Sequence, residues 1–146
     1  MKRLLFVILS TLCFALPTQA FDHLDGKQII HPGTTNRSES SVMTIHLSRQ
    51  DLVFEVEIRY EQVRPGMRFL VSPGTILFHG TLDRFGRVNG TAYSFKTGCP
   101  PAGYYVSGNV IEYDRQIVLR GAAPLWRDCN VVNYVYNHNS TLQFFY

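Results

Sequence analysis

Two glutamates on one face of a predicted strand form the acidic pair whose spacing best suits catalysis. Glu55 and Glu57 lie two residues apart, which places them about 7 Å apart on an extended strand. Two carboxylates at that distance suit the hydrolysis of glycosidic bonds. Arg59 lies on the same face and offsets their charge, and such a row of polar side chains is also typical of the wet face of an amphipathic strand. We therefore predict no catalytic site here.

Other residue types that carry chemistry are dispersed along the chain. No histidine lies at metal-ligand spacing from another histidine, cysteine or carboxylate on one strand face, so no metal site is predicted. Val106-Ser107-Gly108 lacks the first glycine of a nucleophile elbow and falls in the middle of a strand. A glycine-rich phosphate loop with its lysine and following helix is missing as well. The sequence predicts a protein that is not an enzyme and needs no cofactor.

The first 20 residues have the pattern of a secretory signal peptide. Lys2 and Arg3 precede an apolar run, and Pro17 and Ala20 follow it at the cleavage site. The run is too short to span about 30 Å of hydrocarbon. We expect cleavage near Ala20 and a periplasmic or secreted product. Of 14 basic side chains, 12 would remain to face 11 acidic ones, which gives no reason to expect nucleic acid as a partner.

Two cysteines remain once Cys13 leaves with the signal peptide. Cys99 and Cys129 in an oxidising compartment predict one disulfide. Closing a loop of about 31 residues stabilises the fold by roughly 3.5 kcal/mol in the chain-entropy description. With two predicted strands between them, both cysteines fall at the same end of an antiparallel sheet, where a bridge is geometrically possible.

Aromatic and basic residues flank this predicted disulfide. Trp126 and Arg127 precede Cys129, and Tyr104 and Tyr105 follow Cys99. Tryptophan, tyrosine and arginine dominate the binding energy of protein interfaces, so these four residues form our candidate protein-binding surface. The alternative is that Trp126 simply covers the end of a barrel.

Alternating apolar residues dominate the chain from Val42 onward, and no segment has a helical period. Leu52, Phe54, Val56, Ile58 and Tyr60 give the clearest example. Further strands are predicted over 27–30, 42–47, 67–71, 76–82, 88–95, 104–111, 116–121, 130–136 and 141–146, the last two forming a hairpin. We predict an all-β fold, an antiparallel meander of about eight strands closed as a small barrel or sandwich.

The chain divides into three predicted parts. Residues 1–20 are the signal peptide, residues 21–41 are a polar leading segment rich in turn formers, and residues 42–146 are the β domain.

The C-terminal half also resembles a group of known proteins. The pattern runs Gly90-Thr91-Ala92-Tyr93-Ser94-Phe95, Cys99-Pro100, Tyr105-Val106-Ser107-Gly108, Arg115, Ile117-Val118-Leu119-Arg120-Gly121, Ala123-Pro124, Asp128-Cys129 and Tyr134. Over roughly residues 76–146 it is similar to small exported proteins of unknown function from soil and plant-associated alphaproteobacteria. The resemblance implies export and a β-rich fold and brings no catalytic residues.

These observations predict an exported protein that acts by binding, with a role in the cell envelope or in contact with a host. One alternative is a periplasmic inhibitor of lysozyme or of a protease, because the chain is similar to such inhibitors in size, predicted location and number of strands. A second alternative is a minimal outer-membrane barrel, because Leu142, Phe144 and Tyr146 alternate and end on an aromatic residue. Membrane strands need about 9 to 11 residues, and several strands here are shorter, so we expect no membrane association.

Overall fold

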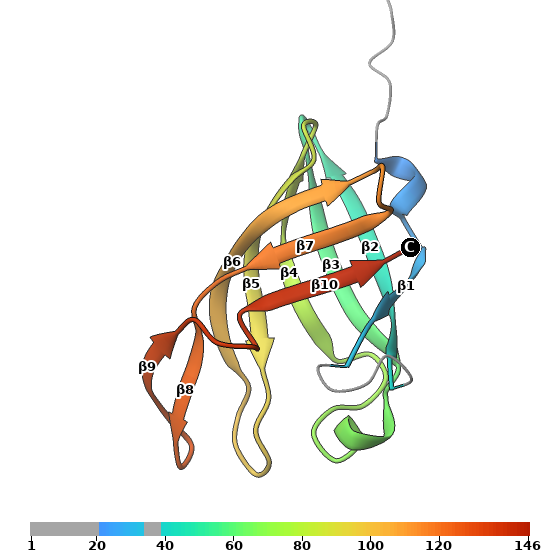
Figure 1. Cartoon of the computed structure of the whole chain (residues 1–146). Helices are drawn as coiled ribbons and strands as arrows, with labels where there is room; N and C mark the ends of the chain where they lie inside the picture. The colour runs from blue at the N-terminus through green and yellow to red at the C-terminus, as the bar shows by residue number, and fades with distance from the viewer. Residues whose placement is uncertain (1–20, 34–38) are drawn as a thin grey trace, which may run out of the picture.

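The computed structural model describes residues 21–33 and 39–146, and the predicted signal peptide lies outside the described residues. Ten strands and two short 3-10 turns make up the fold (Figure 1). The strands are β1 (Gln28–His31), β2 (Ser41–Gln50), β3 (Val53–Gln62), β4 (Ile76–Asp83), β5 (Arg87–Ser94), β6 (Ala102–Ile111), β7 (Gln116–Arg120), β8 (Ala123–Arg127), β9 (Asn130–Val135) and β10 (Thr141–Phe145). The 3-10 turns are η1 (Asp22–Leu24) and η2 (Pro65–Met67).

Eight of these strands form a closed antiparallel barrel in the order β1-β10-β7-β6-β5-β4-β3-β2. Each strand from β2 to β6 pairs with the next along the chain, and β10 and β1 complete the circle between β7 and β2. The predicted all-β class, the closed meander and the Cys99–Cys129 disulfide are confirmed. The described chain contains no helix that is long and apolar enough to cross a membrane.

Strand alternation fills the barrel with apolar side chains. Phe54, Val56, Ile58 and Tyr60 of β3 are buried, as predicted, while Leu52 is exposed because it lies in the turn before that strand. Buried side chains from the other barrel strands complete one continuous core. The charged residues of β3 lie on the outer face, where water solvates them.

Two glycines bring neighbouring strands close together on one side of the barrel. Gly80 of β4 is paired with Gly90 of β5. A Cβ atom built on Gly90 would lie 2.4 Å from the Cα of Gly80, which is far inside van der Waals contact. The sequence therefore needs glycine at both positions for the backbones to approach this closely.

The two ends of the barrel differ. At the closed end, short turns connect β2 to β3, β4 to β5 and β6 to β7, and η1 covers the interior with the fully buried Leu24. At the open end, longer segments cover residues 63–75, 95–101 and 136–140. Figure 1 shows the β8–β9 hairpin projecting away from the barrel at this second end. We call this hairpin, residues 123–135, the arm.

The sequence misassigned the strand that carries residues 130–136. It was expected to pair with residues 141–146, yet β9 pairs with β8, and β10 pairs with β7 and β1. The strand β8 went unnoticed because it contains Pro124, which removes a backbone donor and argues against a strand within a sheet. A two-stranded arm tolerates this proline because each strand has an edge without a partner strand in its sheet.

Two further expectations change. The strand predicted over 67–71 is absent, since Pro65 begins η2 and the amide of Met67 donates to the Arg64 carbonyl oxygen at 3.0 Å. Residues 28–31 of the predicted leading segment form β1 of the barrel, close to the short strand expected over 27–30. Ile29 of β1 is fully buried, and β1 pairs with both β2 and β10. The β domain therefore includes residues before position 42.

Candidate binding site

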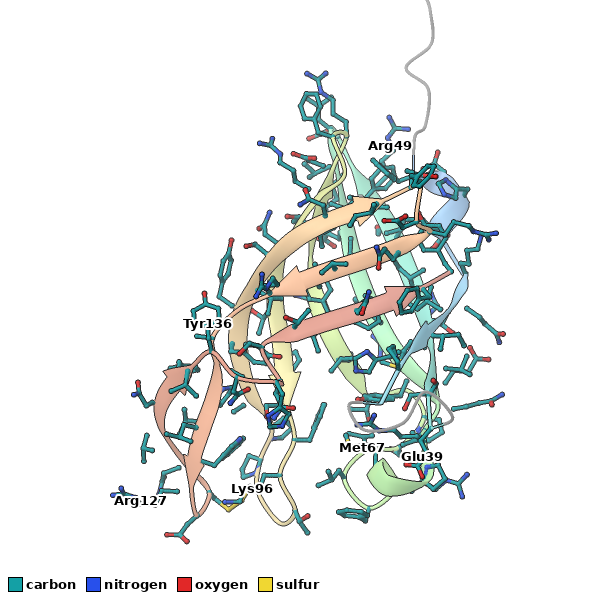
Figure 2. All side chains as sticks on the ribbon, in the orientation of Figure 1. Glu39, Arg49, Met67, Lys96, Arg127 and Tyr136 are labelled. Carbon is teal, nitrogen blue, oxygen red and sulfur yellow. A yellow bond between two sulfur atoms is a disulfide. The ribbon has the colours of Figure 1, made fainter. Side chains whose placement is uncertain are left out.

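The arm is fixed to the loop between β5 and β6. The Cys99–Cys129 disulfide joins this loop to the tip of the arm across a Cα–Cα distance of 5.1 Å. Lys96 Nζ donates to the Asp128 carbonyl oxygen at 2.6 Å, and Trp126 Nε1 donates to Ser94 Oγ at 3.4 Å. Figure 2 shows Lys96 near the disulfide and Arg127 close to the arm's free end. A covalent bond and two hydrogen bonds thus set the position of an otherwise projecting hairpin.

The disulfide lies at the expected end of the barrel, but for a different reason from the one the sequence suggested. Three strands separate the two cysteines, because β8 follows β6 and β7. In a simple meander, three strands would place the cysteines at opposite ends. Since β8 leaves the barrel, its last residues reach the loop at 95–101 (Figure 1).

The four residues of the candidate protein-binding surface do not form one patch. Tyr104 is buried inside the barrel and Tyr105 is exposed outside it, because neighbouring residues of a strand point to opposite faces. Trp126 is half-buried and donates to Ser94. Arg127 is exposed on the arm. Tyr104 and Tyr105 both line a concave part of the outer surface, and of these two only Tyr105 is exposed.

That concavity lies between the barrel wall and the arm, and we call it the tyrosine groove. It has a volume of about 460 Å³. The residues that line it are Gly103, Tyr104, Tyr105, Ser107, Arg120, Gly121, Ala122, Tyr134 and Tyr136. Tyr105 is 66% exposed, Tyr134 51% and Tyr136 75%. Figure 2 places Tyr136 at the base of the arm, beside the barrel.

The sequence did not connect Arg120, Tyr134 and Tyr136 with this surface. The two tyrosines lie two residues apart and so share one face of β9 and its extension. Assigning β9 to the barrel placed that face in a packed sheet. The available signal was Pro124, which marks β8 as a strand outside the barrel wall.

A second concavity, the mouth cavity, opens at the same end of the barrel. Its volume is about 280 Å³. Its lining comes from β1, β3, β4, β5, β6, β8 and β10 and from the loops around them: His31, Pro32, Tyr60, Arg64, Met67, Leu77, Tyr93, Ser94, Phe95, Tyr104, Ala123, His138, Asn139, Thr141, Leu142 and Gln143. Burial raises the pKa of Tyr60 to about 12 and lowers the pKa of His31.

The acidic pair lies elsewhere, on the outer wall. Glu55 and Glu57 line a shallow hollow of about 200 Å³ with His46 and His79. Arg59 binds the Glu57 carboxylate through Nη2 at 2.5 Å and Nε at 2.9 Å. In the described part of the chain, no group of three or more histidine, cysteine, aspartate or glutamate residues is arranged to hold a metal ion.

Comparison with models of known families, with curated proteins and with solved structures gave no match to this chain. The resemblance to exported alphaproteobacterial proteins therefore stays a prediction.

Proposed function

We propose that this is an exported binding protein that holds an extended segment of a partner protein in the tyrosine groove. The observation that carries the proposal is the group of three largely exposed tyrosines around one groove, beside an arm fixed by a disulfide. Tyrosine provides a large contact area and loses little side-chain entropy on binding, because it has only two side-chain torsions.

The charge of the groove indicates the chemistry of the bound segment. Arg120 is the one charged residue among those that line the groove. No salt bridge joins Arg120 to a carboxylate in the described part of the chain. An acidic residue of the partner would complete this pair, while flanking apolar or proline residues would pack on the tyrosine rings. Grooves lined by aromatic residues bind extended, proline-containing segments in this manner.

The position of the arm supports binding without rearrangement. The disulfide and the Lys96 and Trp126 hydrogen bonds restrict the arm before a partner arrives. A surface that is already ordered loses less conformational entropy on association.

Two further features support binding over the other functions considered. Arg59 neutralises the Glu57 carboxylate, which weakens the case for an acid–base pair with Glu55. The barrel has apolar residues inside, while charged residues such as Glu55, Glu57 and Arg59 lie on the outer wall. That distribution suits a barrel surrounded by water and is the reverse of one with a lipid-facing apolar band.

Peptide selection tests this proposal directly. A random peptide library is selected on the full chain, produced through an export pathway so that the disulfide forms. We expect acidic peptides with neighbouring proline or apolar residues to be enriched. Tyr105→Ala and Tyr136→Ala should each weaken their binding by about 5-fold to 30-fold, which corresponds to about 1 to 2 kcal/mol for truncating an important interface residue.

Tyr113→Ala is the matched control, because Tyr113 is 96% exposed in the turn at the closed end. This variant should bind the selected peptides as the unchanged protein does. Failure to enrich any peptide, or equal binding by all three variants, would contradict the proposal.

A further inference from the structure

The mouth cavity has an uncompensated positive charge. Arg64 lines it at the point where the chain leaves β3, and its side chain is half-buried. The cavity lining contains no aspartate or glutamate. No carboxylate in the described part of the chain forms a salt bridge with the Arg64 guanidinium. A half-buried guanidinium is stabilised when an anion pairs with it, so this arrangement favours an anionic ligand.

His31 contributes a polar atom to the cavity without adding charge. Its Nδ1 lies 3.0 Å from the Gln143 carbonyl oxygen, a partner that can only accept, so Nδ1 carries the hydrogen. Burial lowers the pKa of His31 and keeps the ring neutral at neutral pH. The Nε2 atom is then an acceptor. The ring also packs against Phe144, with 5.1 Å between the ring centroids.

Aromatic rings form the deeper wall of the cavity. Tyr60 is 4% exposed and meets Phe95 edge to face, with ring centroids 6.3 Å apart. These two rings give the cavity an apolar wall.

We propose that the mouth cavity binds a small organic carboxylate, whose acid group pairs with Arg64 and whose flat apolar body packs against Tyr60 and Phe95. Drug-sized ligands occupy cavities of about 300 to 1,000 Å³, so this cavity suits a molecule of about ten non-hydrogen atoms. The mouth of a β-barrel is a common place for such a site. The tyrosine groove lies on the outer wall, and this second site does not depend on it.

Nuclear magnetic resonance titration of the full chain tests the site with defined probes. Phenylacetate carries both features of the proposed ligand, 2-phenylacetamide lacks the charge, and acetate lacks the apolar body. We expect phenylacetate to shift the amide resonances of Tyr60, Arg64 and Gln143. It should bind at least about tenfold more tightly than either comparison probe, the effect of one charge-assisted pair in a partly buried site.

Arg64→Gln should abolish the preference for phenylacetate over 2-phenylacetamide. Arg68→Gln is the matched control, since Arg68 lies in the same loop and donates to the Val63 carbonyl oxygen at 3.3 Å outside the cavity lining. Circular dichroism melting verifies that both variants fold. Equal binding of the acid and the amide, shifts that map away from the mouth, or no binding would each overturn the proposal. Peptide binding in the tyrosine groove is measured separately and can succeed or fail independently.

Discussion

At the scale of single residues, the ionisation of the buried Tyr60 makes the stability of the folded protein depend on pH. Its burial raises the pKa of the phenol to about 12, against about 10 in an unfolded chain. The folded protein therefore keeps the proton more tightly than the unfolded chain does. The resulting stability is fully present below pH 10 and is lost as the pH rises from about 10 to about 12.

Tyr60→Phe should remove this dependence. The difference of two pKa units corresponds to at most about 3 kcal/mol of unfolding free energy. We expect urea unfolding, followed by circular dichroism at several pH values, to show a smaller alkaline loss of stability in Tyr60→Phe than in the unchanged protein. The exposed Tyr113→Phe is the control and should keep the full dependence. Identical pH profiles for all three proteins would contradict the prediction.

The neighbouring residues Tyr104 and Tyr105 show what sequence reasoning achieved for the site. It placed the candidate surface at the end of the barrel where the disulfide lies, and it favoured aromatic and basic residue types. It then grouped two residues that lie on opposite sides of the barrel wall, although alternation along a strand separates them. Composition locates such a region, while the face of each side chain depends on strand pairing.

At the scale of elements, the pairing of β8, β9 and β10 was the part of the fold that sequence could not determine. The alternation in β3 predicted that strand and its buried face, because a strand with one face in the core has an apolar residue at every second position. The partner of β9 depended on recognising β8, a five-residue strand with Pro124 near its start. Such a short run has too few alternating positions to distinguish a strand from a loop.

The disulfide should matter for the arm more than for the barrel. Replacing both cysteines, in Cys99→Ser with Cys129→Ser, removes the covalent restraint on a loop that includes β6, β7 and β8. We expect the unfolding free energy to fall by about 2 to 4 kcal/mol. Amide hydrogen exchange should accelerate in residues 95–101 and 123–135, because the barrel hydrogen bonds of β6 and β7 do not involve the disulfide.

Hydrogen exchange measured by mass spectrometry on oxidised and doubly substituted protein distinguishes the two regions. Reduction of the unchanged protein with a thiol reagent is the control and should reproduce the pattern. Equal loss of protection in β3, β4 and the arm would show that the disulfide supports the whole barrel instead.

At the scale of the whole molecule, the barrel is closed by the short strand pair β1 and β10, which we call the seam. The strand β1 has four residues, and it pairs with β10 through Ile30 and Phe145. By contrast, β2 and β3 pair along most of their length. Few hydrogen bonds join the two ends of the sheet, so opening at this seam costs less free energy than separation of any long strand pair.

Native-state hydrogen exchange should therefore find the lowest opening free energy at β1 and β10. Ile29→Ala removes a fully buried side chain of β1 and should destabilise the protein by about 2 to 5 kcal/mol. It should also lower protection at the seam before it affects β3 and β4. The exposed neighbour Ile30 provides the control in Ile30→Ala, which should cost less. Uniform protection around the barrel would contradict this prediction.

The chain leaves the barrel for the arm and returns to it at nearly the same point. The Gly121 amide donates to the Ser140 carbonyl oxygen at 3.0 Å, and Arg120 of β7 is paired with Thr141 of β10. The strands on either side thus already have the spacing of an ordinary hairpin. The arm is consequently an insertion that evolution or a designer can lengthen, exchange or remove without altering the barrel register. The barrel and the arm are thus encoded in separable stretches of this chain.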